Sequence, residues 1–115
     1  MRVLSDAEYQ NAMENGEFKL PEFSGPAAVI LTQSWCTQWI FMKNYIPEAE
    51  KRFPAIGIVY FEYDQSPFFE EFMAYKENTF QNREIPYIRY YRDGICTSWS
   101  NFVSLEGFLH RLQSQ

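Results

Sequence analysis

The sequence is poor in the residues that most often bind metals or cross-link small domains: its 115 residues include two cysteines and one histidine. Two cysteines without a repeated spacing do not make a disulfide framework. One histidine, His110, and two separated cysteines also fall short of the four ligands of a structural zinc site. We therefore expect no metal centre and no bound cofactor, and we expect His110 to be a surface residue of the last helix.

Basic residues and long apolar stretches are scarce as well. Ten Lys and Arg stand against fifteen Asp and Glu, for a formal net charge of -5, whereas nucleic acids and anionic membranes are bound by basic faces. No segment approaches the roughly 20 apolar residues of a membrane span, and the N-terminus lacks the apolar core of a secretory signal. We expect a cytoplasmic protein that has neither nucleic acid nor membrane as its partner, which leaves small molecules and proteins.

Aromatic residues, in contrast, are plentiful. Phe, Tyr and Trp make up 19% of the chain and apolar residues of all kinds 46%, which is typical of a packed domain rather than a disordered chain. A length of 115 residues suits one domain with one sizeable core and is too short for two. We predict a single domain over residues 1–115.

Local patterns predict an alternation of strands and helices. The capping box Ser5-Asp6-Ala7-Glu8 begins a first helix, which should end at Asn15-Gly16. A continuous apolar run, Ala27 to Leu31, is typical of a central strand buried on both faces. Asp93-Gly94 is a hairpin signal between two strand-like segments. The expected order is strand 2–4, helix 6–15, strand 27–31, helix 37–52, strand 56–63, helix 68–76, strand 85–91, strand 95–99 and helix 105–112.

Three short motifs, in this order and spacing, resemble the thioredoxin family over about residues 2 to 112. They are Trp35-Cys36 at a strand-to-helix junction, Tyr63-Asp64-Gln65-Ser66-Pro67 after the middle strand, and Ile85-Pro86 before a strand that ends in Arg92-Asp93-Gly94. The resemblance implies a thioredoxin fold of the α/β class, with a central mixed β-sheet of four or five strands flanked by helices on both faces. It also implies that Ile85-Pro86 is a cis peptide facing Cys36 across a substrate groove.

The active-site motif departs from the dithiol pattern of that family, because it reads C-x-x-W rather than C-x-x-C. Trp39 stands where the resolving cysteine would be. Ile30 stands where the resemblance would place a buried acid that moves protons for the second thiol, and Thr32 replaces a tryptophan of the family. Dithiol reductase activity is therefore not expected.

Cys36 is the candidate catalytic residue, and two interpretations of it remain open. Unpaired N–H groups and the dipole at a helix N-terminus stabilise a thiolate, so Cys36 could attack a disulfide or a glutathione adduct and form a mixed disulfide that an external thiol releases. Its activity would be that of a monothiol disulfide oxidoreductase acting on protein thiols or disulfides, with glutathione as a candidate co-substrate. Alternatively, burial beside Trp35 and Trp39 leaves the thiol inert.

The alternative function is a binding module that keeps the groove without the chemistry. Backbone groups beside cis-Pro86 would pair with an extended peptide segment, and Trp35, Trp39 and Tyr87 would form an aromatic rim around it. This hypothesis places Trp39 at the surface. The candidate substrate-binding residues are Trp35, Trp39, Ile85, Pro86 and Tyr87.

Cys96 is not expected to replace the missing resolving thiol. It follows Asp93-Gly94, at the end of the expected hairpin opposite Pro86. A strand of about six residues spans roughly 20 Å, whereas the Cα atoms of a disulfide lie within about 7 Å of each other. We interpret Cys96 as a small buried or edge-strand residue.

Overall fold

The strands form one mixed sheet in a computed structural model that describes residues 1–113. Strand β1 pairs with β3 in parallel, as does β2, whereas β4 is antiparallel to both β2 and β5. The spatial order is β1-β3-β2-β4-β5, so the N-terminal segment adds a fifth strand at one edge. The strands are β1 (Arg2–Val3), β2 (Pro26–Thr32), β3 (Gly57–Glu62), β4 (Tyr87–Arg92) and β5 (Ile95–Ser100).

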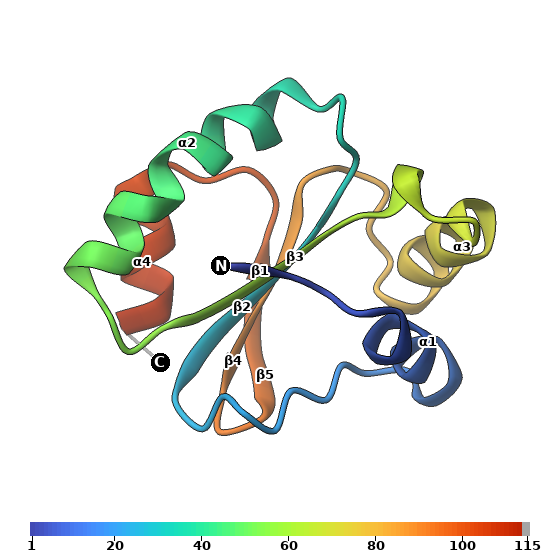
Figure 1. The fold of residues 1–115 in the computed structure, drawn as a ribbon, viewed down its shortest axis with the longest axis horizontal. Helices are drawn as coiled ribbons and strands as arrows, with labels where there is room; N and C mark the ends of the chain where they lie inside the picture. The colour runs from blue at the N-terminus through green and yellow to red at the C-terminus, as the bar shows by residue number, and fades with distance from the viewer. Residues whose placement is uncertain (114–115) are drawn as a thin grey trace.

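Helices cover both faces of the sheet, as predicted. Figure 1 shows α2 and α4 on one face and α1 and α3 on the other. A short 3-10 turn, η1, follows β3. Among the described residues, none of the helices is long and apolar enough to cross a membrane. The bounds are α1 (Asp6–Asn15), α2 (Thr37–Arg52), η1 (Tyr63–Gln65), α3 (Phe69–Thr79) and α4 (Leu105–Gln113).

The ends of α1 form as the local sequence predicts. The Ser5 hydroxyl accepts a hydrogen bond from the Glu8 N–H at 3.2 Å, and the Glu8 carboxylate accepts one from the Ser5 N–H at 2.8 Å. Gly16 ends the helix with φ of 87°, a left-handed conformation that glycine adopts without steric cost. The capping box and the glycine stop are both confirmed.

The sheet separates two apolar cores, and β2 contributes to both. All seven residues of β2 are buried, and their side chains alternate in direction along the strand. Ala27, Val29 and Leu31 pack into the core on the α1 and α3 face. Ala28 and Ile30 pack into the core on the α2 and α4 face. The prediction that the run from Ala27 to Leu31 is a central, doubly covered strand is therefore confirmed.

Helix α2 buries only some of its apolar side chains, along one narrow face of the helix. Its buried residues are Trp39, Met42, Ile46 and Ala49, which recur at the spacing of one helix face. Phe41, in contrast, is 58% exposed. Four consecutive apolar residues, 39 to 42, extend over most of the helix circumference, so at least one of them must face solvent.

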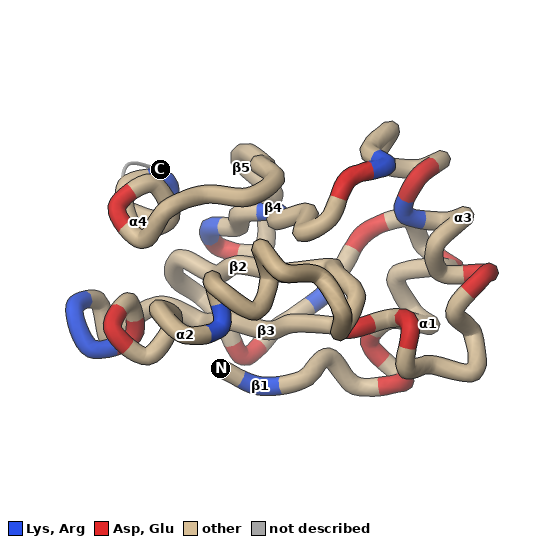
Figure 2. Tube along the Cα trace, turned by 90° about the horizontal axis from the view of Figure 1, so that it is seen from above, with Lys and Arg blue, Asp and Glu red and all other residues tan. Residues whose placement is uncertain are grey.

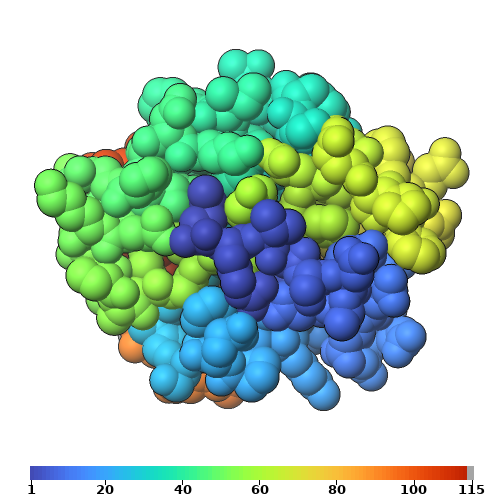
Figure 3. All heavy atoms as spheres, in the orientation of Figure 1, coloured from blue at the N-terminus to red at the C-terminus, as the bar shows by residue number. Residues whose placement is uncertain are grey.

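The N-terminal strand is held by charged contacts as well as by the sheet. The terminal amino group of Met1 pairs with the carboxylate of Glu50, and Arg2 contacts Glu8 at 2.7 Å and Glu22 at 2.8 Å. In the space-filling view, this segment lies across the surface beside the part of the chain that includes β3 (Figure 3). Arg2 therefore ties β1 to α1 and to the loop that follows it.

Charged residues lie at the helix ends that favour them. Figure 2 shows acidic segments on both α1 and α3, and Glu70 and Glu71 lie in the first turn of α3. Lys51 and Arg52 lie in the last turn of α2. Negative charges near a helix N-terminus and positive charges near a C-terminus complement the helix dipole, so these charges stabilise the helices that carry them.

Candidate functional site

Cys36 lies at the junction of β2 and α2, where it is the residue that begins the helix. Its carbonyl accepts the first hydrogen bond of α2, from the Ile40 N–H at 3.0 Å, whereas its side chain caps none of the helix N–H groups. Unpaired N–H groups at a helix N-terminus favour a nearby negative charge. A thiolate at Cys36 would therefore lie beside the positive end of a 16-residue helix.

The thiol of Cys36 faces the segment that leads into β4. Its Sγ atom lies 3.8 Å from the carbonyl oxygen of Ile85, and the Ile85–Pro86 peptide bond is cis. Cys36 itself is only 5% exposed. The fold thus brings together three of the predicted site residues, Cys36, Ile85 and Pro86, although they come from distant parts of the chain.

Asp64 fixes the loop that precedes Cys36. Its carboxylate accepts hydrogen bonds from the backbone N–H of Ser34 at 2.7 Å, from the Ser34 hydroxyl, and from the side-chain amide of Gln65 at 3.0 Å. Burial raises the pKa of Asp64, but the bonds from Ser34 and Gln65 outweigh it and hold the pKa below its ordinary value. Asp64, from the motif after β3, therefore orients the loop that carries the Trp35-Cys36 motif.

Trp39 is buried, and its predicted place in a surface rim is wrong. The side chain is 0% exposed, its indole N–H donates to Glu62 Oε2 at 2.7 Å, and Lys43 Nζ donates to the same oxygen at 3.0 Å. The indole packs 5.3 Å from the ring of Tyr60. The physical reason is its position on α2, because Trp39 begins the stripe that continues one turn later with Met42 and packs on the sheet.

The interior behind the thiol is apolar. Ile30 is 0% exposed and lies in the same core as Cys36 and Trp39. It fills the place that the resemblance gives to a buried acid, while Trp39 fills the place of the second thiol. The two positions that the resemblance gives to a proton acceptor and a resolving cysteine are thus both occupied by fully buried side chains of the same core.

Tyr87 is also buried, so its predicted place in the rim is wrong. It is 1% exposed and belongs to the core on the α1 and α3 face, whereas Cys36 belongs to the core on the other face. Its ring lies 5.6 Å from that of Phe80, and its hydroxyl accepts a hydrogen bond from Arg89 at 3.0 Å. The reason is strand alternation, which turns residue 87 away from the thiol.

Trp35 precedes Cys36 in the chain, Phe41 lies on α2 and Phe102 lies in the loop between β5 and α4. These aromatic residues are 66%, 58% and 38% exposed. The rings of Phe41 and Phe102 are 5.9 Å apart. Phe102 follows Asn101, whose side-chain amide donates to the carbonyl of Pro86 at 3.0 Å. Sequence reasoning found Trp35 and missed the other two. The apolar run 39–42 was an available signal for Phe41; Phe102 depends on a loop that only the fold places.

Cys96 lies in β5 opposite Tyr91, near the far end of β4 from Pro86. Both cysteines are free thiols in the structure. Burial raises the pKa of Cys96, although Arg89 acts in the opposite direction. A raised pKa disfavours the thiolate, which is the reactive form, so Cys96 is suited to packing rather than to exchange.

Polar side chains, of which Lys76 and Asn82 are buried, hold residues 82 to 86, the segment whose Ile85 carbonyl faces Cys36. Lys76, on α3, is 0% exposed, and its Nζ donates to the carbonyls of Asn82 at 3.1 Å and Glu84 at 2.7 Å. The side-chain amides of Asn82 and Asn101 bond to each other in both directions, at 3.0 and 3.1 Å. The amide of Asn101 also reaches the carbonyl of Pro86.

Lys76 is expected to make stability rise with pH above neutrality. Burial lowers its pKa from 10.5 to about 8, although Glu77 and Glu84 act in the opposite direction. Between these values the unfolded state binds more protons than the folded state, so the free energy of unfolding increases with pH, by about 1 kcal/mol from pH 7 to pH 9. Urea unfolding of the wild type and Lys76→Met at both pH values measures this; an equal pH dependence in the two proteins would contradict it.

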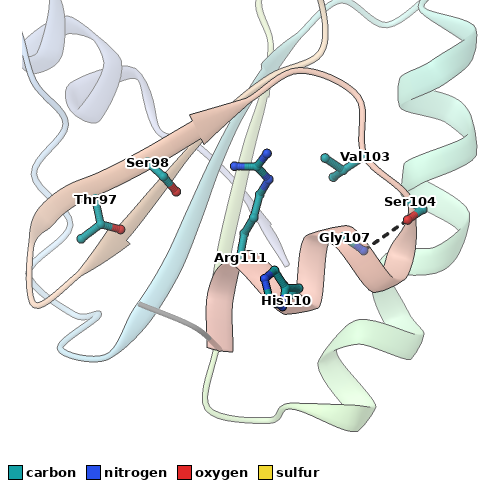
Figure 4. Close-up of a pocket in the computed structure, with 7 residues that line it drawn as sticks. All are labelled: Thr97, Ser98, Val103, Ser104, Gly107, His110 and Arg111. Carbon is teal, nitrogen blue, oxygen red and sulfur yellow. Dashed lines mark hydrogen bonds between the residues drawn. The ribbon is translucent and has the colours of Figure 1, made fainter.

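A surface pocket of about 610 Å³ lies between β5 and α4, and Cys36 and Pro86 are not among its lining residues (Figure 4). Within it, the Ser104 hydroxyl accepts a hydrogen bond from the Gly107 N–H at 3.2 Å. His110 is exposed and lines this pocket, which confirms it as a surface residue of the last helix. The lining residues are Thr97, Ser98, Val103, Ser104, Gly107, His110 and Arg111.

Comparison with known proteins gives similarity in structure alone. No family model and no curated protein sequence matches the chain. Thioredoxin O2 from Arabidopsis thaliana superposes with a TM-score of 0.68 at 14% identity, over 99% of this chain and 91% of that chain. The thioredoxin of Fasciola hepatica gives a TM-score of 0.66 at 16% identity, over 98% of this chain and 100% of that chain. Mitochondrial thioredoxin 3 from Saccharomyces cerevisiae gives a TM-score of 0.67 at 11% identity, over 100% of this chain and 94% of that chain.

Each match extends over at least nine-tenths of both chains rather than over one motif. Identities this low establish the path of the chain and not its chemistry. Together with the strand order and the helices on both faces, the superpositions show that this chain has the thioredoxin fold.

Proposed function

We propose that the protein takes part in thiol–disulfide exchange through Cys36 as a single thiol. The observation that carries the proposal is the placement of Cys36 Sγ, at the N-terminus of α2 and 3.8 Å from the carbonyl of Ile85 beside cis-Pro86. The helix N-terminus stabilises a thiolate. The adjacent irregular segment offers backbone groups with which an extended peptide can pair.

The exchange has two steps. The Cys36 thiolate attacks one sulfur of a disulfide R–S–S–R′, forms the mixed disulfide Cys36–S–S–R and releases R′–S⁻, which takes up a proton. An external thiolate R″–S⁻ then attacks the sulfur of R, forms R–S–S–R″ and releases Cys36 as the thiolate. Because Trp39 occupies the place of a second thiol, the second step needs an external thiol such as glutathione.

A second candidate function is non-covalent binding of an extended peptide. It is favoured by the contrast between Cys36, which is 5% exposed, and the aromatic residues Trp35, Phe41 and Phe102, which are exposed. Exposed aromatic side chains often contribute much of the binding energy at protein interfaces. In this case the segment at Pro86 would pair with the peptide backbone and the thiol would stay unused.

Reaction with oxidised glutathione separates the two functions. In a Cys96→Ser background, we expect oxidised glutathione to add one glutathione at Cys36, visible by mass spectrometry and removed by dithiothreitol. The double variant with Cys36→Ser is the control for background labelling. The absence of an adduct at Cys36 would refute exchange and leave peptide binding.

A further inference from the structure

The burial of Lys76 has a specific structural reason. Lysine is almost never fully buried without a partner, because removing its charge from water is costly. Two of the partners of Nζ are the backbone carbonyls of Asn82 and Glu84, and the ring of Tyr87 lies 5.7 Å from it. An aromatic face attracts a cation at this distance. The buried ammonium group is thus compensated by the segment that leads into β4.

A second set of contacts, from the loop between β5 and α4, holds residues 82 to 86. Asn101 lies in the loop between β5 and α4, and its side-chain amide donates to the carbonyl of Pro86 at 3.0 Å. It also bonds in both directions to the side chain of Asn82, which in turn accepts a hydrogen bond from the N–H of Glu84 at 3.0 Å. The segment is therefore fixed from α3 and from the β5–α4 loop.

Hydrogen bonds hold the carbonyls on both sides of Ile85. The carbonyl of Glu84, one residue before, accepts from Lys76 Nζ at 2.7 Å and from the Asn101 amide at 3.5 Å, and the carbonyl of Pro86, one residue after, accepts from the Asn101 amide at 3.0 Å. The carbonyl between them, that of Ile85, faces Cys36 Sγ at 3.8 Å. Fixing both neighbours leaves the Ile85 peptide little freedom to rotate, since successive peptide planes share only two soft dihedral angles per residue.

We propose that Lys76 and Asn101 are positioning residues for the Cys36 site: by holding the carbonyls of Glu84 and Pro86, they keep the Ile85 backbone where an extended peptide disulfide is aligned with the thiolate. The inference rests on the proposed exchange function. Neither residue touches the thiol, so each acts through the segment it holds. A displacement of about 1 Å in a reacting geometry can lower a rate by about 100-fold.

The test compares a substrate that uses the groove with a reagent that does not. The substrate is an extended hexapeptide whose third residue is a cysteine joined by a disulfide to thionitrobenzoate. The Cys36 thiolate attacks the sulfur of the peptide, forms the Cys36–peptide disulfide and releases one thionitrobenzoate, which is the chromophore. The reagent is iodoacetamide. We expect Lys76→Met, which keeps the length of the side chain and removes its donors, to react with the peptide about 10- to 100-fold more slowly. Its rate with iodoacetamide should stay within about twofold of the wild type.

The matched control is Lys51→Met, the same substitution at an exposed position in the last turn of α2. It should react at wild-type rates with both compounds. Asn101→Ala removes the other anchor and leaves Lys76 in place, so it decides the question if Lys76→Met does not fold. It too should lose rate with the peptide alone. Wild-type rates with the peptide in both Lys76→Met and Asn101→Ala would overturn the proposal, as would equal losses with both compounds.

A measurement without substrate separates this inference from the proposed function. Hydrogen–deuterium exchange by mass spectrometry reports the amides of residues 82 to 88 in the reduced protein, where the Glu84 N–H is bonded to Asn82. Exchange there should be faster in Lys76→Met and Asn101→Ala than in the wild type and Lys51→Met. A wild type that fails to react with the peptide would count against exchange chemistry at Cys36. Unchanged protection in both variants would overturn the positioning role, whatever the chemistry.

Discussion

Replacing Trp39 with alanine is expected to lower the free energy of unfolding by about 3–5 kcal/mol, the usual cost of removing a large aromatic side chain from a core. Trp39 is 0% exposed and shares its core with Ile30, which is equally buried. The substitution leaves a cavity there and removes the indole donor from Glu62, which keeps Lys43 as its partner. Urea unfolding followed by circular dichroism measures the loss.

The chain offers a matched control four residues earlier. Trp35→Ala makes the same chemical change at a side chain that is 66% exposed, and surface substitutions of this kind usually change stability by no more than about 0.5 kcal/mol. Trp39→Phe should lie between the two, because it keeps most of the buried ring and loses the hydrogen bond to Glu62. A loss in Trp39→Ala no larger than that in Trp35→Ala would contradict the buried placement.

A mixed disulfide formed at Cys36 is expected to persist unless an external thiol is added. In a dithiol site the second thiol attacks from within the same molecule, and such intramolecular attack has a very large rate advantage. Here Trp39 fills that place, so release in buffer should be at least about 100-fold slower than release with millimolar glutathione. The adduct with the hexapeptide, isolated by gel filtration, can be followed by mass spectrometry with and without glutathione.

Cys96→Ser is the control for this persistence. Cys96 pairs with Tyr91 on the neighbouring strand, whereas Cys36 faces Ile85 at the other end of that hairpin. The wild type and Cys96→Ser should therefore retain the peptide equally well. Release from the wild type without added thiol, accompanied by a bond between Cys36 and Cys96, would show that the protein resolves its own adduct and that the prediction is wrong.

The order of strands and helices was predictable because its signals are local. A run such as Ala27 to Leu31 is apolar at every position, which suits a strand covered on both faces whatever surrounds it. The capping box at Ser5 and the glycine at Gly16 act within one helical turn. The position of Cys36 at the start of α2 follows from the same kind of signal, since the apolar run ends just before the helical spacing begins.

The directions in which individual side chains point were harder to predict from the sequence. Trp39 and Trp35 are the same residue type within one short segment, yet one is 0% and the other 66% exposed. The burial of Trp39 depends on how α2 is rotated against the sheet, which the run of four apolar residues from 39 leaves open, whereas Trp35 lies in the turn before the helix. The contact between Asn82 and Asn101 joins residues 19 positions apart, and only the packing of the β5–α4 loop brings them together.

The filled interior behind Cys36 also limits how this protein can change. A cysteine at position 39 is far smaller than the indole it would replace, and it would stand beside Ile30 rather than beside an acid. A working dithiol at this site therefore needs coordinated changes at both positions, because Trp39→Cys alone would open a cavity of the kind that destabilises cores by several kcal/mol.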